Sequence, residues 1–169
     1  MNSKISLIIP VYNECDEIVN FFNELKKCNF DLINEIIFVN DCSTDDSPNL
    51  LEKKIKEFEN SFKVNFSIFN NLKNRGYGFS IKKGVYNSNN DTIAIIDLDR
   101  TYKIDDLNDI SHEFVNNYKL QYDLIAGQRK IDTTNTSRLK IIGKTIINTI
   151  ANFCFNEKII DYNSGLRVF

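Results

Sequence analysis

The strongest constraint on the fold is a regular alternation of short apolar runs with longer amphipathic ones. The short runs are rich in Ile, Val and Phe, which favour β-strands, and they cover residues 5–9, 35–39, 64–69, 92–96 and 123–126. Helical periodicity with one apolar face fills the intervals, at residues 14–27, 47–58, 78–85 and 105–118. Because the strands are apolar on both faces, this order predicts an α/β fold with a mostly parallel central sheet covered by helices.

Composition limits the domain organisation and the classes of partner. The chain has 169 residues, of which 42% are hydrophobic and 26% charged, so we expect a single domain over residues 1–169. The balance of 21 basic against 23 acidic residues gives a net charge of -2, which argues against nucleic acid as a partner. Four scattered cysteines and one histidine exclude a Cys/His zinc cluster and indicate a reduced, cytoplasmic setting. No run is long and apolar enough for a signal peptide or a membrane span.

Polar residues follow four of the predicted strands in succession. In open parallel sheets, ligands bind beyond the carboxyl ends of the strands, where the winding direction switches. A single acidic residue there is more often a helix cap or a turn residue than a ligand, but four such strand ends indicate a shared site. In chain order, the residues at these ends are Pro10, Tyr12 and Glu14; Asp41; Arg75 and Gly76; and Asp97 and Asp99.

Asp97-Leu98-Asp99 is the most informative of these stretches. Residues two apart in a strand face the same side, so both carboxylates can meet one ligand. Such a pair suits a phosphatase of the haloacid dehalogenase type or a metal-binding nucleotide-sugar transferase. Residues 97–101 match the phosphatase motif except at Arg100. In those phosphatases the motif follows the first strand, whereas here three strand-helix units precede it, so its position favours the metal site.

The glycines of Gly76-Tyr77-Gly78 do not complete a known nucleotide-binding motif. A dinucleotide fingerprint requires a third glycine where Ile81 stands. A phosphate loop requires Gly-Lys-Ser/Thr, but Lys83 precedes its neighbouring glycine. We therefore expect a turn that leads into a helix, whose N-terminus favours phosphate.

Five motifs in the same order resemble family 2 glycosyltransferases, and within them the branch of dolichol-phosphate mannosyltransferases and polyprenyl-phosphate glycosyltransferases. They lie at residues 10–14, 39–47, 74–78, 97–99 and 163–169, so the resemblance covers essentially the whole chain. It implies a GT-A fold, a Rossmann-like three-layer α/β/α arrangement, and inverting transfer from a nucleotide diphosphate sugar. The chain departs from the family pattern at Asn40, Cys42 and Arg100, where Asp, Gly and a small residue are usual.

The resemblance implies a role for each matching residue. Carboxylates suit hard cations such as Mg²⁺ or Mn²⁺, which act as Lewis acids toward a departing diphosphate. The implied metal ligands are Asp97, Asp99 and Thr101. The implied nucleotide-sugar site comprises Pro10, Tyr12, Glu14, Asp41, Arg75, Gly76 and Asp97, with Asp41 at the base or ribose. Arg75 and Arg129 would add positive charge near the phosphates, and the implied catalytic residues are Asp99, Arg129 and Asp161.

The acceptor determines whether a general base is needed. A lipid phosphate is already anionic, whereas a sugar hydroxyl requires a carboxylate within hydrogen-bond reach. The resemblance implies that Asp161 positions or deprotonates the acceptor and that Ser164, Gly165 and Arg167 lie on the acceptor side. The alternatives are a turn-capping role for Asp161 and packing against the sheet for Arg167.

Residues 139–155 predict a helix with an unusually broad apolar surface. Its narrow polar stripe consists of Lys140, Lys144, Asn148 and Asn152. Such a surface suits peripheral contact with a membrane, at its cytoplasmic face, or a path for an isoprenoid tail. The alternative is a helix buried by further C-terminal residues. Relatives usually continue past the motif at residues 163–169, so we expect a catalytic domain cut short on its acceptor side.

We therefore expect a metal-dependent inverting glycosyltransferase that charges a polyprenyl phosphate, dolichyl or undecaprenyl. The main alternative is a soluble family 2 transferase with a saccharide acceptor in cell-wall or surface polysaccharide synthesis. A sugar nucleotidyltransferase would carry a Gly-rich loop after the first strand, which this chain lacks. An inactive nucleotide-binding relative is the remaining alternative.

Overall fold

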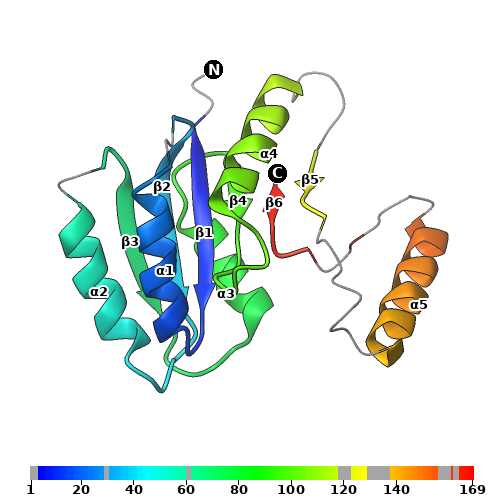
Figure 1. Ribbon diagram of the computed structural model, residues 1–169, viewed down its shortest axis with the longest axis horizontal. Helices are drawn as coiled ribbons and strands as arrows, with labels where there is room; N and C mark the ends of the chain where they lie inside the picture. Colours follow the sequence, from blue (N-terminus) through cyan, green and yellow to red (C-terminus); the bar gives the residue numbers. More distant parts are fainter. Residues whose placement is uncertain are drawn as a thin grey trace.

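The computed structural model describes residues 4–28, 31–59, 62–117, 123–128, 138–155, 161 and 164–169 (Figure 1). The strands are β1 (Ile5–Val11), β2 (Ile33–Asn40), β3 (Asn65–Asn70), β4 (Thr92–Ile95), β5 (Ile125–Ala126) and β6 (Arg167–Val168). The helices are α1 (Cys15–Leu25), α2 (Ser47–Phe58), α3 (Tyr77–Tyr86), α4 (Ile104–Asn117) and α5 (Arg138–Phe155).

The strands form one mostly parallel sheet in the order β3-β2-β1-β4-β6-β5. Strands β1 to β4 pair in parallel, and β6 runs antiparallel to both of its neighbours. The mostly parallel α/β fold expected from the sequence is confirmed. The short strand β6 was not predicted, because a two-residue strand has no periodicity of its own. It exists through its pairing with β4, which sets Ala94 opposite Val168 and Ile95 opposite Arg167.

Two apolar clusters bury the two faces of the sheet and so create its three layers. Leu7 and Ile9 of β1 belong to the cluster that α1, α2 and α4 cover. Ile8, between them, points to the opposite face and packs in the cluster that Ile81 of α3 joins. Successive strand residues face opposite sides of a sheet, so the uninterrupted apolar run of β1 supplies both clusters. This arrangement confirms the three-layer α/β/α fold (Figure 1).

The winding direction of the chain reverses at β1. From this central strand the chain builds β2 and β3 on one side and β4 on the other. Ligand sites of open α/β sheets lie at such a switch point, beyond the carboxyl ends of the strands. The loops after β1, β2 and β4 meet there and carry most of the residues singled out in the sequence.

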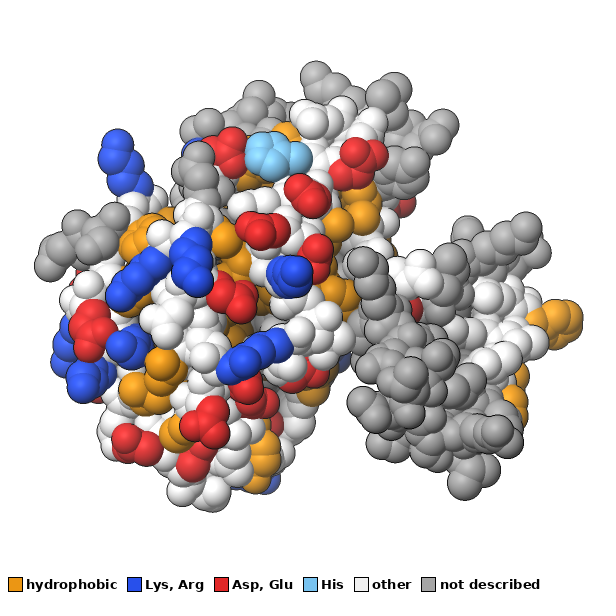
Figure 2. All heavy atoms as spheres, viewed as in Figure 1, with side chains coloured by type: hydrophobic (Ala, Val, Ile, Leu, Met, Phe, Trp, Pro, Cys, Tyr) orange, Lys and Arg blue, Asp and Glu red, His pale blue; other side chains and the backbone are white. Residues whose placement is uncertain are grey.

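Helix α5 stands apart from the sheet (Figure 1). Among its described side chains, Ile146, Ile147 and Ile150 are each more than half exposed, and Phe153 is 88% exposed. Figure 2 shows hydrophobic side chains on the outer edge of the region that contains this helix. Within the described ranges, no helix has the length and apolar character needed to cross a bilayer. The predicted apolar surface of residues 139–155 is therefore exposed in the described part of the helix.

Candidate active site

A pocket of about 330 Å³ opens at the carboxyl ends of β1, β2 and β4. This volume lies at the lower end of the range for small-molecule sites, about 300–1,000 Å³. The pocket contains every residue predicted for the nucleotide-sugar site except Arg75. The described residues that line it are Pro10, Val11, Tyr12, Glu14, Asp41, Asn74, Gly76, Tyr77, Ser80, Asp97, Leu98 and Asp99.

One wall of the pocket is built from two loops that are hydrogen-bonded to each other. In the loop between β1 and α1, the Asn13 N–H donates to Ser43 Oγ at 3.0 Å, and the Glu14 N–H donates to Ser47 Oγ at 2.8 Å. In return, the Thr44 N–H donates to Asn13 Oδ1 at 2.8 Å. Asn13 has a φ of 57°, a conformation that Asn adopts more readily than most residues. These bonds fix the loop that carries Tyr12 and Glu14.

Asp41 holds the opposite wall in place. Its Oδ1 accepts hydrogen bonds from Asn71 Nδ2 at 2.7 Å and from the Arg75 N–H at 2.8 Å, and its Oδ2 accepts one from the Gly76 N–H at 2.6 Å. Burial acts to raise the pKa of Asp41, but these hydrogen bonds outweigh it and lower the pKa below its ordinary value. The carboxylate thus stays ionised and anchors a turn in which Gly76 has a φ of 84°. The contact with base or ribose expected from the sequence stays a prediction.

The two arginines expected near the phosphates are not both placed. The guanidinium of Arg75 lies 4.2 Å from the ring centroid of Phe79, in a cation–π contact, and Arg75 does not line the described pocket. Arg129 lies outside the described residues. The phosphate-binding role of both residues stays a prediction.

Negative charge accumulates where the pocket meets the end of β4. Burial raises the pKa of Glu14, and the neighbouring charges of Asp99, Glu17, Asp45 and Asp97 raise it further. A carboxylate with a raised pKa among other carboxylates indicates a site whose charge a cation would relieve.

The donor set fits a divalent cation only together with a substrate. Among the described residues, no group of three or more His, Cys, Asp or Glu side chains could hold a metal ion. Asp97 and Asp99 offer oxygen ligands alone, and Mg²⁺ is usually bound by one or two carboxylates plus substrate phosphates. The Thr101 N–H donates to Asp99 Oδ1 at 3.0 Å, while a metal-binding role for the Thr101 hydroxyl stays a prediction.

Gly165 lies against Asp97 so closely that no side chain fits between them. A Cβ atom at position 165 would lie 1.9 Å from Asp97 Oδ2 and 2.5 Å from its Cγ, far inside van der Waals contact. The sequence assigned Gly165 to the acceptor side. The geometry adds a second role, because the absence of a side chain at Gly165 leaves room for the Asp97 carboxylate, which the sequence predicts as a metal ligand.

The other residues expected on the acceptor side are largely buried. The Ser164 hydroxyl lies 2.9 Å from the Tyr102 hydroxyl and donates to the Leu166 carbonyl at 2.8 Å, and Ser164 is 1% exposed. Asp161 is 5% exposed and accepts a hydrogen bond from the Ser164 N–H at its backbone oxygen. In this structure Ser164 ties β6 to the segment that follows Asp99, and neither residue presents a broad surface to an acceptor.

Tyr77 is a site residue that sequence reasoning missed. It lines the pocket with 43% of its surface exposed, and partial burial together with the Asp97 carboxylate raises the pKa of its phenol above the ordinary value. The positive charge of Arg167 acts on the phenol in the opposite direction, so Arg167 also lies near the site. The sequence feature that could have indicated Tyr77 is its position between Gly76 and Gly78 after the third strand, a segment for which the sequence predicts only a turn.

Comparison with known protein families gives one match that spans nearly the whole chain. Residues 6–169 match the sequence profile of "Glycosyl transferase family 2". A dolichyl-phosphate beta-glucosyltransferase of Dictyostelium discoideum is 29% identical over 138 residues. This alignment covers 76% of the chain and 40% of the relative, so the chain spans about two fifths of that protein's length.

Solved structures share the fold. TarS of S. aureus, residues 1–349 in complex with UDP, has a TM-score of 0.59 and 22% identity over 80% of this chain and 38% of that one. The mannosyltransferase PcManGT from Pyrobaculum calidifontis, in complex with GDP-Man and Mn²⁺, has a TM-score of 0.51 and 18% identity. The match covers 57% of this chain and 27% of PcManGT. At these identities the similarity shows the fold alone, which is GT-A.

Proposed function

The chain belongs to glycosyltransferase family 2, and we propose that it is an inverting, metal-dependent transferase that uses a nucleotide diphosphate sugar. The observation that carries this proposal is the pocket that Asp97 and Asp99 line together with Tyr12 and Asp41. An acidic pair beside an aromatic, polar wall suits a ligand that combines a nucleoside with a diphosphate. The complexes of UDP with TarS and of GDP-Man and Mn²⁺ with PcManGT support the donor class.

The proposed metal site uses Asp97 and Asp99, completed by the two phosphates of the donor. A bound Mg²⁺ or Mn²⁺ would offset the negative charge that develops on the departing nucleoside diphosphate. The Tyr77 phenol has an ordinary pKa of about 10 and is protonated near neutral pH, and the Asp97 carboxylate favours this form further, so the phenol is a hydrogen-bond donor beside Asp97. The absence of a side chain at Gly165 leaves room for the Asp97 carboxylate. The Asp41 carboxylate accepts a hydrogen bond from the Gly76 N–H and so fixes the turn at the pocket wall.

We propose a polyprenyl phosphate as the acceptor. The Dictyostelium relative is a dolichyl-phosphate glycosyltransferase, and the exposed apolar side chains of α5 suit contact with a lipid tail or a membrane surface. The phosphate of such an acceptor is already anionic and needs little help from a general base. An acceptor that needs no general base is consistent with the burial of Asp161, which is 5% exposed and therefore poorly placed to take a proton from a bulky substrate.

Comparing acceptors tests the proposal directly. We expect sugar transfer from a panel of UDP, GDP, dTDP and CDP sugars to a short polyprenyl phosphate, measured with Mn²⁺ present. A Phe153→Ser change should weaken transfer to the lipid about tenfold or more, because burial of one large apolar side chain is worth about 1.5–3 kcal/mol. It should leave nucleotide binding unchanged.

The matched control for the lipid test is Tyr86→Ser. Tyr86 is 89% exposed on α3, so this change removes a similar exposed ring from another surface and should leave lipid transfer as it is. Transfer to free saccharides alone would contradict the lipid assignment and favour a saccharide-acceptor transferase.

A further inference from the structure

Arg100 has a backbone conformation that disfavours an arginine. Its φ is 57°, and among the described residues only Asn13 and Cys42 share a positive φ without being glycine. This left-handed region crowds the Cβ atom, and glycine would occupy it without steric strain. Strained residues of this kind cluster at functional sites, and Arg100 directly follows Asp99. The conformational cost at this position therefore indicates that the arginine side chain makes a contact that a glycine could not make.

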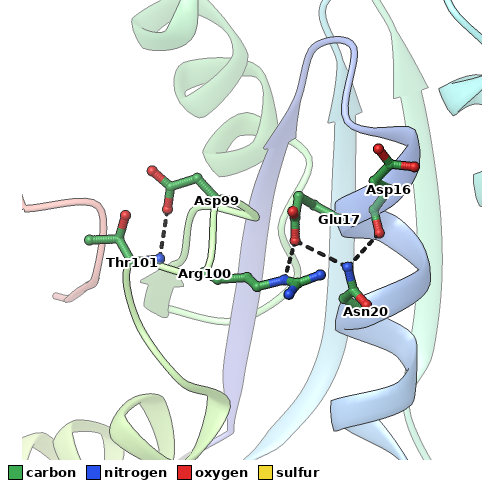
Figure 3. A network of polar contacts seen from close by, with 6 residues as sticks. All are labelled: Asp16, Glu17, Asn20, Asp99, Arg100 and Thr101. Atoms are coloured by element: carbon green, nitrogen blue, oxygen red, sulfur yellow. Dashed lines mark hydrogen bonds and ion pairs between the residues drawn. The ribbon is translucent and has the colours of Figure 1, made fainter.

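The Arg100 side chain is tied to helix α1. Its Nε lies 2.5 Å from Oε2 of Glu17, in an ion pair between the turn after β4 and the first turn of α1 (Figure 3). Asn20 Nδ2 lies 3.4 Å from the same Glu17 oxygen and donates to the backbone oxygen of Asp16 at 2.7 Å. Glu17 is thus oriented within its own helix, where a negative charge in the first turn is also favoured by the helix dipole.

The anchor on α1 is rigid because the helix is fixed in the core. Phe22, five residues after Glu17 in the same helix, is 1% exposed and packs against Phe38 and Phe58, with ring centroids 5.7 and 4.8 Å away. An ion pair to this helix therefore restrains the turn that contains Arg100 against the folded core.

The restrained turn also contains Asp99. The N–H of Thr101, on the far side of Arg100, donates to Asp99 Oδ1 at 3.0 Å. Figure 3 shows Arg100 extending toward α1 while the Asp99 carboxylate lies on the other side of the turn. Arg100 is accordingly placed to act through Asp99.

We propose that Arg100, held by Glu17, is a positioning residue that fixes the turn of residues 97–101 and so orients Asp99 for the metal. The consequence for metal binding rests on the proposed function, whereas the restraint of the turn does not. The two parts therefore need separate measurements.

Hydrogen exchange of the Thr101 amide, followed by NMR without metal, tests the restraint. Glu17→Gln removes the charge of the pair and should speed this exchange roughly two- to fivefold, the size expected for a partly exposed ion pair. Asp16→Asn is the matched control, because it removes the same charge from the same helical turn while Asp16 contributes only its backbone oxygen to the network. Unchanged exchange in Glu17→Gln would overturn the proposal.

Mn²⁺ titration in the presence of UDP or GDP tests the consequence. Glu17→Gln should weaken the apparent Mn²⁺ affinity roughly two- to fivefold. Nucleotide binding in the absence of metal should be unchanged, and the melting temperature should fall by no more than about 4 °C. Arg100→Ala should speed the Thr101 amide exchange and weaken the apparent Mn²⁺ affinity. Arg100→Lys keeps the positive charge and should change both quantities less. Faster amide exchange with unchanged Mn²⁺ affinity would overturn the positioning role. If the wild-type protein showed no Mn²⁺-dependent binding, the proposed function would fail, while the exchange comparison would still decide the restraint.

Discussion

Replacing Gly165 with Ala is expected to weaken Mn²⁺-dependent nucleotide binding about 10–100-fold, the range for changes next to metal ligands. The added methyl group would lie 1.9 Å from Asp97 Oδ2, so the carboxylate must rotate away from its place at the end of β4. A short side chain can make this movement without unfolding the sheet. We therefore expect only a small change in melting temperature, and calorimetric titration of UDP and GDP with Mn²⁺ measures the binding.

Gly143→Ala is the control for Gly165→Ala. It adds the same methyl group on α5, where a Cβ atom would meet nothing within 4 Å, and α5 has no part in the metal site. Its Mn²⁺-dependent binding should equal that of the wild type. Unchanged metal-dependent binding in Gly165→Ala would show that Asp97 does not need the position seen here.

Asp41→Asn is expected to cost about 1–3 kcal/mol of unfolding free energy, because it leaves a buried donor unsatisfied. The asparagine oxygen can still accept from Asn71 and Arg75, but its amide group would face the Gly76 N–H, a donor against a donor. The turn at Gly76 lines the pocket, so nucleotide binding should also weaken about tenfold, equivalent to 1.4 kcal/mol. Thermal unfolding and nucleotide titration measure the two effects.

The pH dependence of the unfolding free energy distinguishes the contribution of the Asp41 negative charge from that of its side-chain shape. The pKa of Asp41 is lower in the folded state than the value of about 3.9 in an unfolded chain. The carboxylate therefore stabilises the fold above that unfolded value, and this contribution is lost as the pH falls through the lower folded pKa. The difference in unfolding free energy between wild type and Asp41→Asn should be constant near neutral pH and shrink below about pH 4.

Asp46→Asn is the control for the change at Asp41. Asp46 is exposed in the same loop, and the described hydrogen bond of its carboxylate is to Asn49 Nδ2, so we expect a small effect at every pH. A stability difference for Asp41→Asn that persists unchanged at pH 3 would argue against an ionised anchor.

The sequence predicted the parts of the molecule that local patterns determine. Each of the first four strands is an apolar run, and parallel pairing necessarily brings their carboxyl ends together. Tyr12, Asp41 and Asp99 therefore meet in one pocket although they are far apart in the chain. The place of Asp97 and Asp99 after the fourth strand likewise put them in this pocket, whereas their metal-binding role stays a prediction.

The contacts that refine the site could not be predicted, because they depend on non-local geometry. The approach of Gly165 to Asp97 requires β6, a two-residue strand set by pairing with β4. Arg100 stood out in the sequence only as a departure from the family pattern. Its partner Glu17 lies 83 residues away, and no spacing rule connects the two positions. Tyr77 was interpreted as part of a turn because its proximity to Asp97 arises only when α3 packs on the sheet.

The central claim is that Asp97 and Asp99 bind a divalent cation together with the diphosphate of a nucleotide. Calorimetric titration of UDP and GDP into wild type and Asp99→Asn, each with and without Mn²⁺, tests it most directly. We expect Mn²⁺ to raise the affinity of the wild type for one of the two nucleotides about tenfold or more, equivalent to 1.4 kcal/mol, and Asp99→Asn to remove this gain. Affinities that are the same with and without Mn²⁺ in both proteins would contradict the claim.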